Sequence, residues 1–284
     1  MKNNSYIFKK EFPKSAAVAC QGVSGAFSEI ACRKLFEDPK ITFVKSFEDV
    51  FAAVENGDCR YGMIPIENSS AGSVNRTYTL MINHKFFIVR SVVVKVEHSL
   101  LALPDTDIGD IKEITSHEQA LNQCSGFTSS MGVRTFACEN TAVAAKLVAT
   151  SGRRDLAALS SPLCAELYGL KVLKSSVQDS DSNFTRFICI SREPEVYEGA
   201  DRTSIMADIP HVTGSLYKML GVFYGLDINL LKLESRPIPG KNFRFMFYFD
   251  LATCIGSDSF ILMSKMLEKQ GADAVFLGSY SELA

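Results

Sequence analysis

Short apolar runs that suit buried strands alternate with helix-periodic segments along this chain, and that order restricts its fold more than any other feature. After a capping-box pattern at Ser46 and Asp49, apolar residues recur at helical spacing until Gly57. The run at 61–66 is then predicted to be a strand. Strands and helices in alternation are typical of α/β proteins with largely parallel sheets.

A second alternation predicts a separate lobe at about residues 95–165. Strands are expected at 113–116, 134–138 and 156–160, and helices at 117–130 and 141–149. The apolar run at 185–191 is predicted to return to the first sheet, and its polar start would face the cleft if it ran antiparallel to its neighbours. We therefore expect a two-lobed domain over residues 16–194.

Residues 201–284 are predicted to form a smaller unit, after a polar linker between Glu195 and Asp201. Strands are expected at 203–209, 228–233, 243–251 and from 274, with one helix that carries the apolar stripe of Leu216 and Met219 and another at 258–270. This order is βαββαβ, the ferredoxin-like pattern.

The charge balance excludes two classes of partner. Lys and Arg number 30 and Asp and Glu 32, so the formal charge is -2, whereas nucleic acid or anionic lipid calls for a basic surface. The first 14 residues lack the apolar core of a signal peptide, and no uncharged run reaches the roughly 18 residues of a membrane span. We expect a cytoplasmic protein with neither a nucleic-acid nor a membrane partner.

The eight cysteines and four histidines are scattered, without a C-x-x-C pair or the His spacing of a metal site. No metal is therefore expected, and the cysteines in apolar runs are expected to be reduced core residues. The histidines are predicted to be helix caps and surface residues: His84, His98, His117 and His211.

Polar clusters stand where predicted strands give way to helices, which is where open α/β sheets bind ligands. Four clusters have this position and a fifth begins the strand at 185–191: residues 21–25, 67–72, 116–117, 139–141 and 182–186. Together they indicate a small anionic ligand between two lobes. The phosphate loop, the dinucleotide fingerprint and the nucleophile elbow are missing from the sequence, so no nucleotide or other cofactor is expected.

Four segments resemble, in order and spacing, the signatures of the prephenate dehydratase family: residues 22–29, 65–74, 116–124 and 183–187. They include Pro-Ile-Glu-Asn-Ser and Thr-Arg-Phe, and the resemblance covers about residues 17–191. The tail resembles an ACT regulatory domain through Gly-Ser-Leu-Tyr from Gly214 and Glu-Ser-Arg-Pro from Glu234. Ser215 and Tyr217 depart from the family's common Gly-Ala-Leu-Val.

The resemblance implies an α/β fold with a two-lobed, periplasmic-binding-protein-like catalytic domain and a ferredoxin-like ACT domain. It further implies a lyase that converts prephenate to phenylpyruvate in L-phenylalanine biosynthesis, with loss of carbon dioxide and water and no cofactor. L-Phenylalanine is the implied allosteric effector. ACT domains pair side by side, so a homodimer or homotetramer is expected.

The resemblance also assigns roles to residues. Thr185 is implied as the hydrogen-bond donor or acid to the leaving hydroxyl, with electrostatic help or relay from Glu67 or Glu139. Asn68, Ser116 and Gln123 are implied to orient the substrate. The implied effector-binding residues are Gly214, Ser215, Leu216, Glu234, Ser235 and Arg236.

Arg186 is predicted to form a structural salt bridge, because adjacent strand residues face opposite sides of a sheet. It could therefore share a cleft with Thr185 only at a bulge. Two alternatives to prephenate dehydration stay open at this point. One is dehydration of arogenate, in which an amino group replaces the keto group, and the other is a non-catalytic two-lobed amino-acid sensor.

Overall fold

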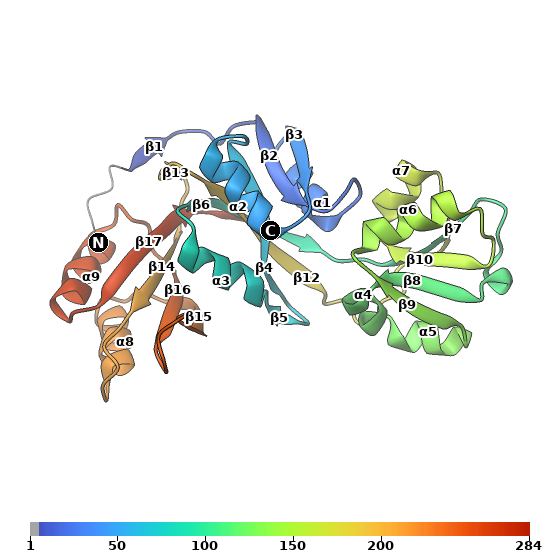
Figure 1. The fold of residues 1–284 in the computed structure, drawn as a ribbon. Helices are drawn as coiled ribbons and strands as arrows, with labels where there is room; N and C mark the ends of the chain where they lie inside the picture. Colours follow the sequence, from blue (N-terminus) through green and yellow to red (C-terminus); the bar gives the residue numbers. More distant parts are fainter. Residues whose placement is uncertain (1–5) are drawn as a thin grey trace.

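The computed structural model describes residues 6–284, and three units lie in a row in Figure 1, with the first lobe in the middle. The first lobe has a seven-stranded sheet in the order β18-β6-β12-β4-β2-β3, with β5 paired to β4. Its elements are β2 (Ser15–Gln21), α1 (Phe27–Leu35), β3 (Asp38–Val44), α2 (Phe47–Asn56), β4 (Tyr61–Asn68), β5 (Gly72–Ser73), α3 (Asn75–Asn83), β6 (Phe87–Lys95), β12 (Phe184–Ser191) and β18 (Glu282–Leu283).

Local sequence explains much of this lobe. The capping box is confirmed, because the Ser46 hydroxyl accepts from the Asp49 amide and the Asp49 carboxylate accepts from the Ser46 amide, and α2 ends at Gly57 in the left-handed conformation. β2 runs parallel to β3 and β4. β12 lies antiparallel between β4 and β6, so the prediction that it returns to the first sheet is confirmed.

The second lobe has a five-stranded sheet in the order β11-β7-β10-β8-β9. Its elements are β7 (Ser99–Ala102), a 3-10 turn η1 (Ile108–Asp110), β8 (Glu113–His117), α4 (Glu118–Gln123), α5 (Ser125–Met131), β9 (Arg134–Cys138), α6 (Thr141–Ser151), β10 (Leu156–Ser160), α7 (Pro162–Tyr168) and β11 (Lys171–Lys174). The lobe extends past the expected end near residue 165. The prediction ended too early because α7 and β11 carry no strong periodic pattern.

The single helix expected at 117–130 is wrong, because the chain breaks at Cys124 into α4 and α5. The Asp179 carboxylate accepts from the Ser125 hydroxyl at 3.0 Å and from the Gly126 amide at 3.1 Å, which satisfies the start of a second helix. The fully buried Cys124 side chain packs in the lobe's core at the break.

Two segments side by side connect the lobes. Residues 96–98 lead from β6 to β7, and residues 175–183 lead from β11 back to β12. The Val96 amide donates to the Asn183 carbonyl at 2.8 Å, and the Val177 amide donates to the His98 carbonyl at 2.9 Å. The structure thus has the two lobes that were expected, and these two segments join them.

The C-terminal unit has the predicted βαββαβ order, with its sheet ordered β15-β16-β14-β17. Its elements are β14 (Arg202–Asp208), α8 (Ser215–Gly225), β15 (Leu230–Pro237), β16 (Phe245–Leu251), α9 (Asp258–Lys269) and β17 (Asp273–Tyr280). Both helices pack into one core with one face of this sheet. The opposite face brings Tyr248 and Tyr280 into the core of the first lobe, beside Ile66 and Tyr78.

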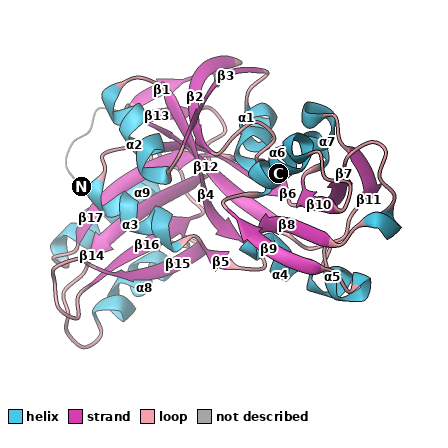
Figure 2. Cartoon of the chain, turned by 45° about the vertical axis from the view of Figure 1, so that its right-hand side comes forward, coloured by secondary structure: helices cyan, strands magenta, loops and turns pink. Residues whose placement is uncertain are grey.

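Two connections differ from the expected domain plan. The predicted linker overlaps β13 (Glu195–Tyr197), which is buried and pairs with β1 (Ile7–Lys9), so that prediction is wrong for residues 195–197. The Glu195 carboxylate accepts from both Tyr61 and Tyr197 hydroxyls, which keeps this segment inside the protein. β18 leaves the C-terminal unit and joins the first lobe beside β6 (Figure 2).

Within residues 6–284, helices are too short or too polar to span a membrane.

Candidate active site

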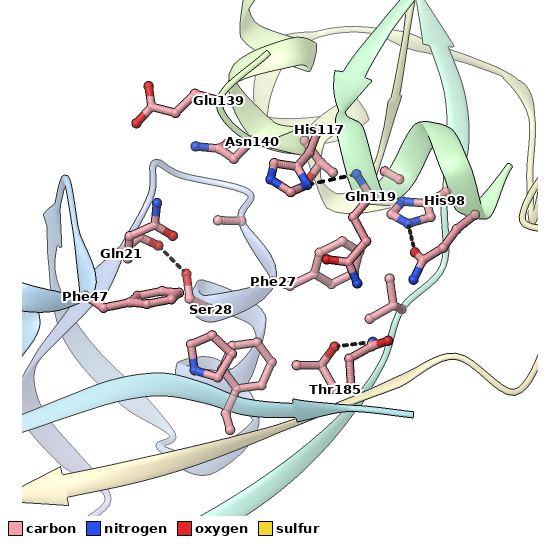
Figure 3. A pocket seen from close by; sticks show the side chains of 18 residues that line it. Gln21, Phe27, Ser28, Phe47, His98, His117, Gln119, Glu139, Asn140 and Thr185 are labelled. Carbon is pink, nitrogen blue, oxygen red and sulfur yellow. Dashed lines mark hydrogen bonds between the residues drawn. The ribbon is translucent and has the colours of Figure 1, made fainter. Parts of the chain in front are cut away.

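A cavity of about 300 Å³ lies between the two lobes, a size suited to a small ligand. Its polar lining comes from both lobes and from one connecting segment: Gln21, Ser28, Asn68, Thr185, His98, His117, Gln119, Gln123, Glu139, Asn140 and Thr141. Phe27, Phe47 and Phe187 contribute aromatic surface (Figure 3). The sequence-based prediction that polar clusters from two lobes meet is confirmed, since each of the five clusters contributes at least one lining residue.

Thr185 and Asn68 face each other across β12 and β4. The Asn68 Nδ2 donates to Thr185 Oγ1 at 3.0 Å and to Asn183 Oδ1 at 2.9 Å. The Asn68 Oδ1 accepts from the Ser70 and Ala71 amides at 3.0 and 2.8 Å. The Asn68 amide group is therefore held in one orientation.

This hydrogen bond determines what the Thr185 hydroxyl can do. Because Asn68 donates to Oγ1, that oxygen acts as an acceptor toward the protein, and its own proton is available to a ligand. Thr185 lines the cavity, and Figure 3 shows its hydroxyl with this hydrogen bond drawn. The site can thus offer a hydrogen bond to a ligand oxygen.

A β-bulge explains how β4 presents two residues to the cavity. Glu67 is opposite Arg186, but Pro65 is opposite Phe187, so Ile66 is an extra residue on β4. Ile66 is buried in the core. The bulge allows Pro65 and Asn68, three positions apart, to line the same cavity.

Glu67 and Arg186 lie on the other side of these strands. Arg186 Nη1 is 2.5 Å from Glu67 Oε2, and Lys232 Nζ is 2.7 Å from Glu67 Oε1. The predicted structural salt bridge of Arg186 is therefore confirmed. Glu67 does not line the cavity, so the expectation of a relay from Glu67 to Thr185 needs correction. The reason is the alternation of side chains along a strand.

Ser116 also lies outside the cavity lining. Its side chain is fully buried, and its hydroxyl donates to the Leu159 carbonyl at 2.6 Å between β8 and β10. The expectation that Ser116 orients a ligand through its hydroxyl is therefore corrected. The next residue, His117, lines the cavity instead.

Gln123 and Glu139 both line the cavity, in different surroundings. The Gln123 Oε1 accepts from Asn183 Nδ2 at 3.0 Å and from His98 Nε2 at 3.2 Å. These bonds leave the Gln123 Nε2 group to donate elsewhere. Glu139 is exposed, and its carboxylate lies across the cavity from Thr185 in Figure 3.

His98 is a site residue that sequence reasoning missed. The prediction of caps and surface positions is confirmed for His117, whose Nδ1 accepts from the Gln119 amide at 3.2 Å. It is wrong for His98, which is 2% exposed and has no partner for Nδ1 in the described structure. Burial lowers the pKa of His98 although its bond to Gln123 opposes the shift. Its place in the long apolar stretch at 86–103 was the available signal.

Charge in the lining is sparse. Among the residues that the structure describes, no Lys or Arg lines the cavity, and Glu139 is the one charged lining residue. An anionic group would be met by amides, imidazoles and hydroxyls. The first turns of α1 and α6, at Ser28 and Thr141, add positive helix ends.

The predicted effector residues divide between two places. Ser215 and Leu216 line a cavity of about 640 Å³ in the C-terminal unit, next to Gly214, which caps α8 with a φ of 82°. Glu234 and Arg236 instead contact the first lobe: the Ser73 hydroxyl donates to the Glu234 carboxylate at 2.5 Å, and Arg236 bonds to Asn75. Ser235 lies between them on β15. Within one chain these two segments do not line one cavity.

The family model for prephenate dehydratase matches residues 18–195. The chain is 37% identical over 249 residues to arogenate dehydratase/prephenate dehydratase 1, chloroplastic, from Arabidopsis thaliana, with 82% of this chain and 64% of the relative covered. It is 38% identical over 232 residues to arogenate dehydratase 2 from Petunia hybrida, with 81% and 59% covered. The chain thus spans about three fifths of the length of these relatives.

Two solved structures extend the likeness over 93% of this chain. One is the prephenate dehydratase of Arthrobacter aurescens in complex with L-Phe, with 27% identity, a TM-score of 0.86 and 90% of that chain covered. The other is GqqA, described as a novel type of quorum quenching acylase, with 30% identity, a TM-score of 0.85 and 97% of that chain covered. On the family model and the plant relatives together, the chain belongs to the prephenate dehydratase family.

Proposed function

We propose that this chain converts prephenate to phenylpyruvate by decarboxylating dehydration, in the synthesis of L-phenylalanine. The observation that carries the proposal is the Asn68 to Thr185 hydrogen bond of 3.0 Å within the interlobe cavity. It leaves the Thr185 proton available to the substrate's ring hydroxyl. Family membership supports the same assignment.

The reaction needs a positioned hydrogen-bond donor more than a strong acid. The bond from the ring to its carboxylate breaks and releases carbon dioxide, and its electron pair enters the ring. The bond from the ring to its hydroxyl then breaks, hydroxide leaves with that electron pair, and the ring becomes benzenoid. A hydrogen bond from Thr185 Oγ1 stabilises the charge that develops on the departing oxygen.

The other lining residues hold the substrate in the reactive conformation. Gln123 directs its Nε2 group to the substrate because its oxygen is already bonded to Asn183 and His98. Phe47 and Phe187 provide apolar surface for the ring, whose conversion to an aromatic product favours such contacts. Glu139 acts at the rim in this proposal, and Ser116 supports the β8–β10 pair from the core.

Arogenate is the second candidate substrate. Prephenate carries two carboxylates and no positive group, whereas arogenate carries an additional ammonium group. The lining of the described cavity has Glu139 and no Lys or Arg, which favours the substrate with the smaller net negative charge. The plant relatives named above include arogenate dehydratases.

For the C-terminal unit we propose an ACT regulatory domain that binds L-phenylalanine near Gly214, Ser215 and Leu216. Its βαββαβ order supports this assignment, as does the L-Phe complex of the Arthrobacter relative. Glu234, Ser235 and Arg236 would join the effector site across a homodimer or homotetramer interface, where ACT domains lie side by side. A cytoplasmic location stays a prediction, and the Arabidopsis relatives are named as chloroplastic.

The experiment compares purified protein with prephenate and with arogenate, following phenylpyruvate and phenylalanine as the respective products. Turnover of either substrate, removed by Thr185→Val in a folded protein, supports the dehydratase. The ratio of kcat/KM values assigns the substrate. Binding of an amino acid without turnover of either compound would instead support the two-lobed sensor. Inhibition by L-phenylalanine, lost in Ser215→Trp, tests the effector site.

A further inference from the structure

Five charged side chains gather on the back of the two strands that carry Asn68 and Thr185. We call them the back-face cluster: Arg202, Glu282, Arg186, Glu67 and Lys232. Their side chains are between 13% and 30% exposed, so water screens them less than it screens surface pairs. The cluster lies where the first lobe meets the C-terminal unit, because Arg186 and Glu67 are on β12 and β4 and Arg202 and Lys232 are on β14 and β15.

The contacts form one continuous chain of alternating charge. Both Arg202 Nη atoms lie 3.1 Å from the Glu282 carboxylate oxygens, a two-point contact. Glu282 Oε2 is 2.5 Å from Arg186 Nε. Arg186 then contacts Glu67, which contacts Lys232. Three members come from the C-terminal end of the chain and two from the catalytic strands.

The catalytic residues are chain neighbours of this cluster. Arg186 directly follows Thr185 on β12, and Glu67 directly precedes Asn68 on β4. The register pairs Arg186 with Glu67 and Thr185 with Asn68 on opposite sides of the same strand ends. A displacement of Arg186 therefore moves the backbone that carries Thr185.

Glu282 is itself firmly anchored in the first lobe. β18 pairs with β6, and the Ser91 hydroxyl donates to Glu282 Oε2 at 3.1 Å. Just before it, β17 passes so close to β6 that a Cβ on Gly278 would lie 2.0 Å from the Ile88 carbonyl oxygen. Burial alone would raise the pKa of Glu282, but its bond to Arg186 holds that pKa below its ordinary value, so the carboxylate is charged.

We propose that Glu282 is a positioning residue for the reaction: it holds Arg186, and through Arg186 it fixes Thr185 and Asn68. The short strand that follows the C-terminal unit thereby sets the geometry of a cavity that it does not line. The catalytic part of this proposal rests on the proposed dehydratase function. Its structural part concerns the free protein and is independent of the substrate.

The test uses Glu282→Gln, Glu282→Asp and Arg202→Gln, with Glu195→Gln as the matched control. Glu195 is also a buried, ion-paired carboxylate, but it contacts Tyr61 at the opposite end of β4. We expect Glu282→Gln to lower kcat about 10- to 100-fold with KM changed less than about threefold, because a small misplacement of a catalytic group costs this much. Glu282→Asp keeps the charge and should recover part of kcat.

Arg202→Gln removes one partner of Glu282 without altering β12, so it should also lower kcat. This variant keeps the test decisive even if Glu282→Gln folds poorly. Glu195→Gln should lower thermal stability and leave kcat of the folded protein unchanged. A general loss of stability, by contrast, would leave the kcat of the folded protein unchanged in both Glu282→Gln and Arg202→Gln. Equal loss of kcat in Glu195→Gln, or unchanged kcat in both Glu282→Gln and Arg202→Gln, would overturn the proposal.

Hydrogen exchange of the ligand-free protein provides a readout without turnover. Amides at 184–187 and 66–69 should exchange faster in Glu282→Gln than in the original protein, and should be unchanged in Glu195→Gln. If the original protein turns over neither prephenate nor arogenate, the proposed function fails while this exchange result still decides the positioning role. Unchanged exchange at both segments would refute it.

Discussion

Asn68 and Thr185 lie opposite each other on the antiparallel strands β4 and β12, with Asn68 Nδ2 3.0 Å from Thr185 Oγ1. Both strands are in the interior of the first lobe's sheet, with β6 on one side and β2 on the other. A site built on central strands is held more rigidly than one built on loops. The Thr185 oxygen is therefore held by Asn68, with its own proton free to be donated, before any ligand arrives.

Two replacements of Thr185 test the role of its hydroxyl separately from the role of its side-chain shape. Thr185→Val keeps the β-branched outline but removes the donor, and we expect kcat to fall at least about 100-fold, as for loss of a donor to a developing negative charge. Thr185→Ser keeps the hydroxyl and should retain more activity than Val. The free energy of unfolding should fall by about 1 kcal/mol in the Val variant because one hydrogen bond is lost. Equal activities of Ser and Val variants would contradict the assigned role.

Replacing Asn68 by Asp tests the direction of the hydrogen bond. The new carboxylate still accepts from the Ser70 and Ala71 amides, but it cannot donate to Thr185 Oγ1. Thr185 would then donate to this carboxylate, away from the substrate, so kcat should fall about 100-fold or more. Steady-state kinetics measures this, with the exposed Asn56→Asp as the chemically identical control. Undiminished turnover in Asn68→Asp would refute the proton direction.

Sequence patterns predicted the features that depend on local order. The helix after Ser46 followed from helical periodicity, and the strand at 185–191 and its return to the first sheet followed from its apolar character. The meeting of Asn68, Gln123 and Thr185 in one cavity agrees with what the family resemblance implied. The helix and the strand need information from only a few neighbouring residues.

The features that sequence reasoning missed depend on contacts between distant segments. The bulge at Ile66 fixes which of Glu67 and Asn68 faces the cavity, and it arises from the register with β12, more than a hundred residues away. Asp179 starts α5 from across the second lobe. The two-residue strand β18 is too short to carry any periodic signal, although it supplies Glu282 to the back-face cluster.

The burial of His98 predicts that the free energy of unfolding depends on pH. Burial lowers its pKa in the folded protein, while the unfolded chain has the ordinary value near 6.5. Below about pH 6.5 the unfolded state therefore binds more protons at this residue, and the free energy of unfolding falls as pH decreases. Denaturant titrations from pH 7.5 to 5 should show this slope, and His98→Gln should reduce it. The exposed His211→Gln is the control, and an unchanged slope in His98→Gln would contradict the prediction.

The close contact between the lobes at Gly25 predicts that adding a side chain there lowers stability. The Gly25 carbonyl accepts from the Ser161 hydroxyl at 2.9 Å, and the Ser24 carbonyl accepts from the Tyr168 hydroxyl at 2.6 Å, so this first-lobe loop is bonded to the second lobe. A Cβ on Gly25, whose φ is 91°, would lie 2.4 Å from Cys164 Sγ. We expect Gly25→Ala to lower the free energy of unfolding by about 2–4 kcal/mol, from overpacking together with backbone strain.

Separation of the lobes should also raise KM in Gly25→Ala, because Gln21 and Phe27 on either side of this loop line the cavity. Gly132→Ala is the matched control, since Gly132 has a φ of 64° and open space around its Cβ position, and only the left-handed backbone costs about 1–2 kcal/mol there. Adding Cys164→Ala to Gly25→Ala removes the clash and should restore part of the stability and of KM. A double variant no better than Gly25→Ala alone would show that backbone strain, and not contact between the lobes, causes the loss.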